Sequence, residues 1–82
     1  MPKLRRLNGQ EIIAILEQFG FVVVRIRGSH YRLKREVNGK SQYLTVPVHG
    51  SQPLATGTIR SIYRQASTYI DKEILEPHFF TA

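Results

Sequence analysis

The chain has 82 residues, with 12 Lys or Arg against 6 Asp or Glu, a formal net charge of +6 and no cysteine. This length leaves room for one small hydrophobic core, and the lack of cysteine excludes disulfides and thiolate metal sites. No apolar run approaches the roughly 20 residues of a membrane span, and the start lacks the apolar core of a secretory signal. We therefore expect a soluble cytoplasmic protein with one domain over residues 1–82 and a core at about 8–67.

The charge is unevenly distributed along the chain. Residues 1–70 hold eleven Lys or Arg and three Asp or Glu, whereas residues 71–82 hold one Lys and three acidic residues. The formal charge is thus +8 in the body and −2 in the tail. A basic body indicates a polyanionic partner, either a nucleic acid or an acidic protein surface. A surface charged only for solubility is the alternative.

The first predicted element is a helix near the start of the chain. Asn8 is a good N-cap residue, and Glu11 three residues later completes the pattern of a capping box. Leu7 and Ile12 are spaced as a hydrophobic staple across that cap. Apolar residues then recur at helical spacing until Gly20, a common helix stop, so this helix is structural.

Three strands are predicted next, over residues 21–27, 30–37 and 41–48. The first segment is rich in β-branched residues, and Gly28-Ser29 turns the chain into the second. Asn38-Gly39 is a strong hairpin signal, because both residues tolerate the positive φ of a type I′ turn. These strands form an antiparallel meander.

A loop over residues 49–57 leads to a second helix that begins near Thr56 to Thr58. A short helical turn is expected around Asp71 to Leu75, and Pro77 should end it because proline lacks an amide donor. We expect the acidic tail over residues 71–82 to be partly mobile.

The predicted fold class is therefore α+β, in the order α-β-β-β-α, with both helices on one face of a three-stranded antiparallel sheet. Alternation along the second strand places Tyr31 and Leu33 on one side of the sheet. It places His30, Arg32 and Lys34 together on the other side. The third strand contains Pro47, which should lie at the strand's end or on a sheet edge.

The run Gly28-Ser29-His30 is the strongest candidate for a catalytic site. RNA carries its own nucleophile, the 2′-hydroxyl, so cleavage needs a base, an acid and cations that stabilise charge on phosphorus. Histidine exchanges a proton near neutral pH, and His30 shares its strand face with cations. Gly28 lets the backbone bend, and Ser29 is placed to orient His30 or to donate a hydrogen bond to phosphate. From the residues alone, a structural or merely exposed histidine is the competing interpretation.

Basic residues on the strands and on the second helix are candidates for RNA binding. Raised salt should weaken such contacts. Tyr31 and Tyr43 are possible stacking platforms for bases, although Tyr31 is better placed for the core. The RNA-binding candidates are Gly28, Ser29, Arg25, Arg27, Arg32, Lys34 and Arg60, with Arg35 and Arg64 as further cations.

His49 is a possible secondary site residue at the end of the third strand. It is either a second proton-transfer group or an RNA contact, or its ring bonds a loop carbonyl; we favour the last, structural role. His30, His49 and His78 lack the spacing of metal ligands, so we expect no metal and no cofactor.

Three short motifs occur in order along residues 8–67: Gly28-Ser29-His30, Val46-Pro47-Val48-His49 and Gly57-Thr58-Ile59-Arg60. Together they resemble the HicA family of toxin ribonucleases from bacterial type II toxin–antitoxin systems. The resemblance implies a fold like that of a double-stranded-RNA-binding domain, which is the element order predicted above from pattern.

The resemblance also implies an activity and a partner. His30 corresponds to the family's catalytic histidine, and the expected reaction is translation-independent endoribonuclease cleavage of mRNA. The expected partner is an acidic HicB-like antitoxin that covers the site, so the protein would be a monomer alone and part of a hetero-oligomer with antitoxin. The alternatives are a non-catalytic RNA-binding module of the same fold and an inactive relative retained for its protein partner.

Overall fold

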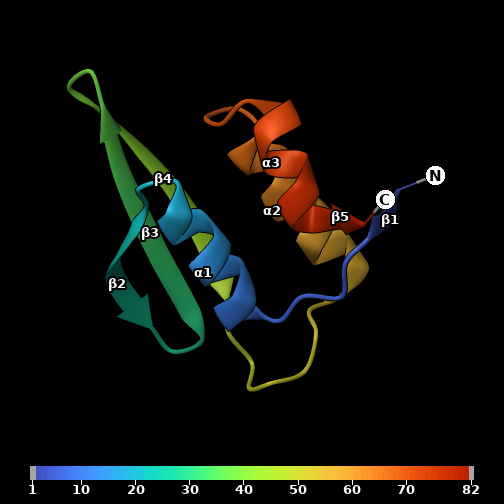
Figure 1. Cartoon of the computed structure of the whole chain (residues 1–82). Coiled ribbons are helices and arrows are strands. Elements are labelled where there is room, and N and C mark those ends of the chain that lie inside the picture. Colours follow the sequence, from blue (N-terminus) through green and yellow to red (C-terminus); the bar gives the residue numbers. More distant parts are fainter. Residues whose placement is uncertain (1, 82) are drawn as a thin grey trace.

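The computed structural model describes residues 2–81, and its element order confirms the predicted α-β-β-β-α arrangement. Two short strands and a third helix are added at the ends of the chain (Figure 1). In chain order the elements are β1 (Lys3–Leu4), α1 (Gly9–Gln18), β2 (Val22–Arg27), β3 (His30–Val37), β4 (Lys40–Pro47), α2 (Thr56–Ala66), α3 (Lys72–Phe79) and β5 (Phe80–Thr81).

The central sheet is an antiparallel meander in the order β2-β3-β4. Val37 pairs with Lys40 across a two-residue turn, in which Asn38 has φ 53° and Gly39 has φ 79°. The predicted type I′ geometry needs positive φ at both positions, and the turn meets this requirement. β4 is an edge strand that ends at Pro47, as expected for a residue without an amide donor.

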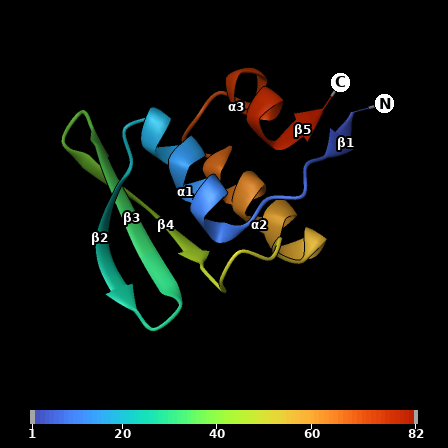
Figure 2. The same cartoon turned by 60° about the horizontal axis from the view of Figure 1, so that its bottom comes forward.

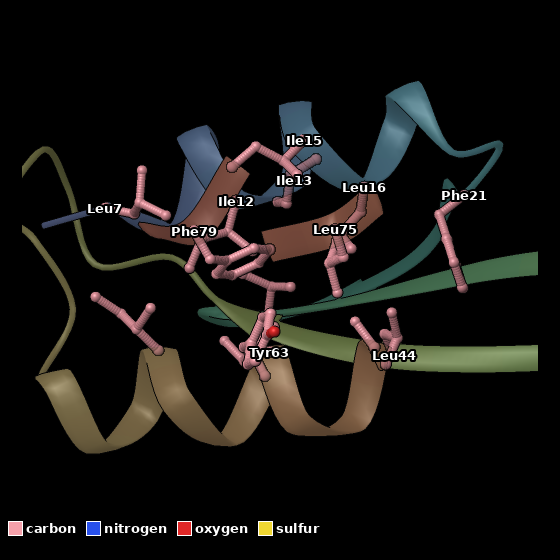
Figure 3. Close-up of a cluster of buried hydrophobic side chains, with 14 of the residues drawn as sticks. Leu7, Ile12, Ile13, Ile15, Leu16, Phe21, Leu44, Tyr63, Leu75 and Phe79 are labelled. Atoms are coloured by element: carbon pink, nitrogen blue, oxygen red, sulfur yellow. The ribbon is translucent and has the colours of Figure 1, made fainter. Parts of the chain in front are cut away.

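Helices α1 and α2 lie on the same side of this sheet, and α3 lies beside α2 (Figures 1 and 2). The helix-covered face of the sheet contributes Leu33, Leu44 and Val46 to the core. These residues pack with apolar side chains of all three helices (Figure 3). Within residues 2–81 no helix covers the opposite face of the sheet, so this face is available to a ligand.

The N-terminus of α1 is fixed by its own cap and by the end of β4. Asn8 Oδ1 accepts from the Glu11 amide at 2.8 Å and Glu11 Oε1 accepts from the Asn8 amide at 2.9 Å, which confirms the capping box. A Cβ atom at Gly9 would lie 2.2 Å from the carbonyl oxygen of Pro47. Only glycine therefore permits this close approach between helix and strand.

The helix in the C-terminal segment is longer than the sequence predicts, and it makes more contacts with the rest of the domain. The expectation that Pro77 ends the helix is wrong, because α3 continues to Phe79. Phe79 is completely buried, and its carbonyl accepts a 2.8 Å hydrogen bond from the Arg5 amide. These tertiary contacts hold the last turn of α3 although Pro77 supplies no amide.

The ends of the described chain lie side by side (Figure 2). Strand β5 pairs with β1 through Lys3 with Thr81 and Leu4 with Phe80. The segment expected to be a partly mobile tail thus packs on the domain, and the core extends beyond residues 8–67; Ala82 lies outside the described residues. None of the helices within residues 2–81 has the length and apolar character needed to cross a membrane.

Candidate functional site

His30 is an exposed residue at the start of β3, directly after the turn at Gly28 and Ser29. Gly28 has φ 59°, and Arg27 pairs with His30 across the two-residue turn. Glycine at the first central position is typical of a type II′ hairpin turn. On its other side His30 pairs with Pro47 of β4. The histidine is therefore in the middle of the three strands, on a tight hairpin.

A backbone hydrogen bond connects this turn to the end of β4. The Val48 amide donates to the carbonyl of Ser29 at 2.7 Å. In an antiparallel ladder, hydrogen-bonded pairs alternate with pairs that lack these bonds. The neighbouring pair of His30 and Pro47 is thus a non-hydrogen-bonded pair, where the missing amide of proline removes no bond. Two of the three motifs found in the sequence meet at this point.

The cations predicted for the strands gather around His30 on the sheet face that the helices leave free. Because Leu33 is buried on the helix side, its neighbours Arg32 and Lys34 point to the free face. Register places Arg25 beside Arg32. We call this surface the strand-face patch; it consists of Arg25, Arg27, His30, Arg32, Lys34 and Tyr43.

Tyr43 provides an aromatic surface within the strand-face patch. The guanidinium of Arg32 lies 4.3 Å from the centroid of its ring, and Lys34 Nζ lies 6.0 Å from it. Lys34 Nζ also lies 3.2 Å from Glu36 Oε1, in an ion pair near solvent. Such exposed pairs are weak, so Lys34 remains available to an anion. The patch thus combines an exposed histidine, cations and an aromatic ring.

Arg35 does not belong to this patch, which corrects the prediction that it lies among the other cations of the strands. Its side chain lies on the helix side of the sheet, over the ring of Phe21 at 4.9 Å. It donates to Gln42 Oε1 at 2.8 Å and to the carbonyls of Phe19 and Tyr69 at 2.9 Å each. Arg35 therefore joins α1, β4 and the α2–α3 connection. Alternation from Tyr31 and Leu33 could have placed it on this face.

Tyr31 is half-buried against the core, as predicted, rather than on the free face.

His49 is exposed just after β4, and its ring has no hydrogen bond to any residue within 2–81. The loop carbonyl expected as its partner is not bonded to it, so the structural role favoured from the sequence is unsupported. Val48 packs against the core, and His49 follows it on an exposed segment next to the Ser29 turn.

Arg60 is not brought together with His30. It lies on α2, in the helical layer, and lines a separate cavity with Arg64 and Lys72.

His78 also lies outside the strand-face patch, because its ring packs edge-on against Phe19 with the ring centroids 5.3 Å apart. Sequence reasoning missed Gly9 and Lys72, whose significance comes only from tertiary contacts. Across the described part of the chain, no three His, Asp or Glu side chains form a cluster suited to a metal ion.

Comparison with family models gives one match, the HicA toxin of bacterial toxin–antitoxin systems, over residues 9–67. The match covers most of the chain and includes α1, the sheet and α2. The chain belongs to the HicA toxin family. No curated protein and no solved structure matches it significantly.

Membership in the HicA family makes this protein a toxin of a toxin–antitoxin system and implies an antitoxin partner. All three motifs noted in the sequence, from Gly28 to Arg60, lie within the matched segment. Strand β1, helix α3 and strand β5 lie outside it. The C-terminal elements are thus an addition to the part that the HicA family model describes.

Proposed function

We propose that this HicA-family toxin is an endoribonuclease that cleaves mRNA at the strand-face patch, with His30 as the proton-transfer residue. The observation that carries the proposal is the position of His30, exposed on the free sheet face between Arg27 and the Arg25–Arg32 row. An exposed histidine surrounded by unburied cations suits a phosphodiester substrate better than it suits the core.

The reaction can be written with groups that RNA and this surface supply. His30 removes the proton of a 2′-hydroxyl, the 2′-oxygen attacks the adjacent phosphorus, and the bond from phosphorus to the 5′-oxygen breaks. The leaving oxygen takes up a proton, and the products are a 2′,3′-cyclic phosphate and a 5′-hydroxyl. Arg27, Arg32 and Lys34 stabilise the negative charge on the phosphoryl oxygens. This route requires no metal ion.

We assign His49 as the candidate for the second proton-transfer step, on the leaving oxygen. It is exposed and follows Val48, which is bonded to the turn that carries His30. The absence of a ring hydrogen bond within the described residues leaves both nitrogens accessible to substrate. Gly28 and Ser29 shape the approach to His30, and the Ser29 hydroxyl donates a hydrogen bond to a phosphate oxygen of the RNA.

The antitoxin is proposed to be an acidic HicB-like protein that occupies the strand-face patch. A negatively charged surface would meet Arg25, Arg27 and Arg32, and it would cover His30. Such a partner blocks RNA entry and proton transfer at once. The toxin alone is proposed to be a monomer, and the complex a hetero-oligomer.

Cleavage of an end-labelled RNA in excess chelator tests the proposed chemistry. We expect full cleavage with chelator, and no cleavage at a position where the substrate carries a 2′-deoxy nucleotide. Loss of activity in chelator, or cleavage on the 3′ side of a 2′-deoxy nucleotide, would contradict the mechanism. Binding of the labelled RNA without any cleavage would instead favour a non-catalytic RNA-binding module.

A further inference from the structure

A second positively charged site lies between α2 and α3, away from the strand-face patch. It is a cavity of about 230 Å³. Residues of α2 form one wall, and residues of the C-terminal segment form the other. The lining residues are Arg60, Tyr63, Arg64, Ser67, Lys72 and Phe80, and we call this site the helix-layer cavity.

Three cations of the helix-layer cavity are free to bind an anion. Arg60 and Arg64 are four residues apart on α2, so their side chains lie on one face of the helix. Lys72 is the first residue of α3. Within residues 2–81 none of these cations lies within ion-pair distance of a carboxylate. Glu73 and Glu76 line the adjacent cavity, which shares Phe80 with this one, and neither is among the lining residues of the helix-layer cavity.

An aromatic pair completes the helix-layer cavity. The rings of Tyr63 and Phe80 meet edge to face, with centroids 5.0 Å apart. Tyr63 is buried, whereas Phe80 is only half-buried and offers part of its ring to a ligand. Burial, with a smaller effect of Glu76, raises the pKa of the Tyr63 phenol, so the phenol stays neutral. Arginines beside an accessible aromatic ring are the features that bind single-stranded nucleic acid.

We propose that the helix-layer cavity is a second RNA contact, in which Arg60, Arg64 and Lys72 hold a backbone phosphate and Phe80 contacts the neighbouring base. The same strand would reach the strand-face patch with another segment. Lys72 and Phe80 come from the segment outside the family match, so this contact is an addition of the C-terminal elements. The identity of the ligand as RNA rests on the proposed function.

The test compares RNA binding in a His30→Ala background, so that the substrate stays intact. Fluorescence anisotropy would measure the affinity for labelled RNAs of about 5 and about 16 nucleotides, lengths that bracket typical single-strand sites. The cavity variant is Arg64→Glu with Lys72→Glu. The matched control is Arg6→Glu with Lys40→Glu, which makes the same charge change at exposed positions elsewhere.

For the cavity variant we expect about a tenfold or greater loss of affinity for the longer RNA and less than about a threefold loss for the shorter one. The control should lose less than about threefold with both RNAs. A Phe80→Leu variant, which keeps the charge and most of the apolar volume, should also lower the affinity for the longer RNA only. Thermal unfolding of each variant verifies that the fold is retained.

Equal losses in the cavity variant and the control would overturn the proposal, because they would show a general charge effect. Unchanged RNA affinity with weaker antitoxin binding would also overturn it and assign the cavity to the protein partner. Failure of the proposed function looks different: the protein with His30 intact would bind RNA in a cavity-dependent way but would not cleave it.

Discussion

The carbonyl of Ser29 accepts a 2.7 Å hydrogen bond from the amide of Val48, and this bond ties the His30 turn to the end of β4. It acts between main-chain atoms, so it positions His30 without restricting the imidazole. Beside it, Pro47 pairs with His30 at a ladder position that needs no amide. The position of His30 therefore depends on the backbone geometry of these strands, and we expect substitutions that disturb this geometry to displace His30.

Gly9 should be essential for stability although it lies outside every sequence motif. In Gly9→Ala the new Cβ would meet the Pro47 carbonyl and the Cα of Val48, neither of which can rotate away. We expect a loss of about 1–3 kcal/mol in the free energy of unfolding. Gly57→Ala is the control, because nothing lies within 4 Å of a Cβ there; it should gain up to about 1 kcal/mol. Urea unfolding compares both with wild type, and equal stabilities would refute the close-approach argument.

Arg32 and Arg35 should separate RNA binding from stability. Arg35→Met removes three hydrogen bonds, so we expect a loss of about 2–4 kcal/mol in stability with little change in RNA affinity of the folded protein. Arg32→Met removes only a surface contact with Tyr43 and should cost less than about 1 kcal/mol. Its RNA affinity should fall several-fold. The opposite pattern, measured by thermal unfolding and anisotropy, would exchange the two assignments.

The C-terminal segment should be required for folding. Phe79 is 0% exposed, so Phe79→Ala should reduce stability by about 3–5 kcal/mol. Ile74, on the same helix but 58% exposed, is the matched position, and Ile74→Ala should change stability by no more than about 0.5 kcal/mol. Calorimetry of the two variants decides the matter. Similar, small effects would show that the segment is dispensable.

Binding of a short RNA should depend steeply on salt. If three or four cations of the strand-face patch contact phosphates, the logarithm of affinity should fall with the logarithm of salt concentration with a slope of about −2 to −3. Arg25→Ala with Arg27→Ala should reduce the steepness by about 1.4. A flat response in the wild-type protein would exclude phosphate contacts as the main source of affinity.

The sequence predicts much of this fold because several of its signals are local. The capping box of Asn8 and Glu11 and the turn of Asn38 and Gly39 need only neighbouring residues, and both form as predicted. Alternation likewise placed His30, Arg32 and Lys34 on one face. What the sequence does not predict depends on distant contacts: Gly9 against Pro47 is an encounter of two separate elements.

Most of the errors also come from distant contacts. Pro77 is a strong local signal for a helix end, but the burial of Phe79 and the hydrogen bonds from Arg5 outweigh it. The helix-layer cavity forms only when α3 folds back beside α2, so Lys72 carries no signal in the sequence. Arg35 is different, because strict alternation from Leu33 would have placed it correctly.

The most direct measurement is the single-turnover rate of RNA cleavage by His30→Ala, beside wild type and His78→Ala. His78 is the control because it packs against Phe19 rather than in the strand-face patch. We predict that His30→Ala lowers the rate by about 10²–10⁴-fold while its melting temperature and RNA affinity stay near wild type, and that folded His78→Ala cleaves normally. A His30→Ala protein that cleaves RNA at the wild-type rate would contradict the central claim.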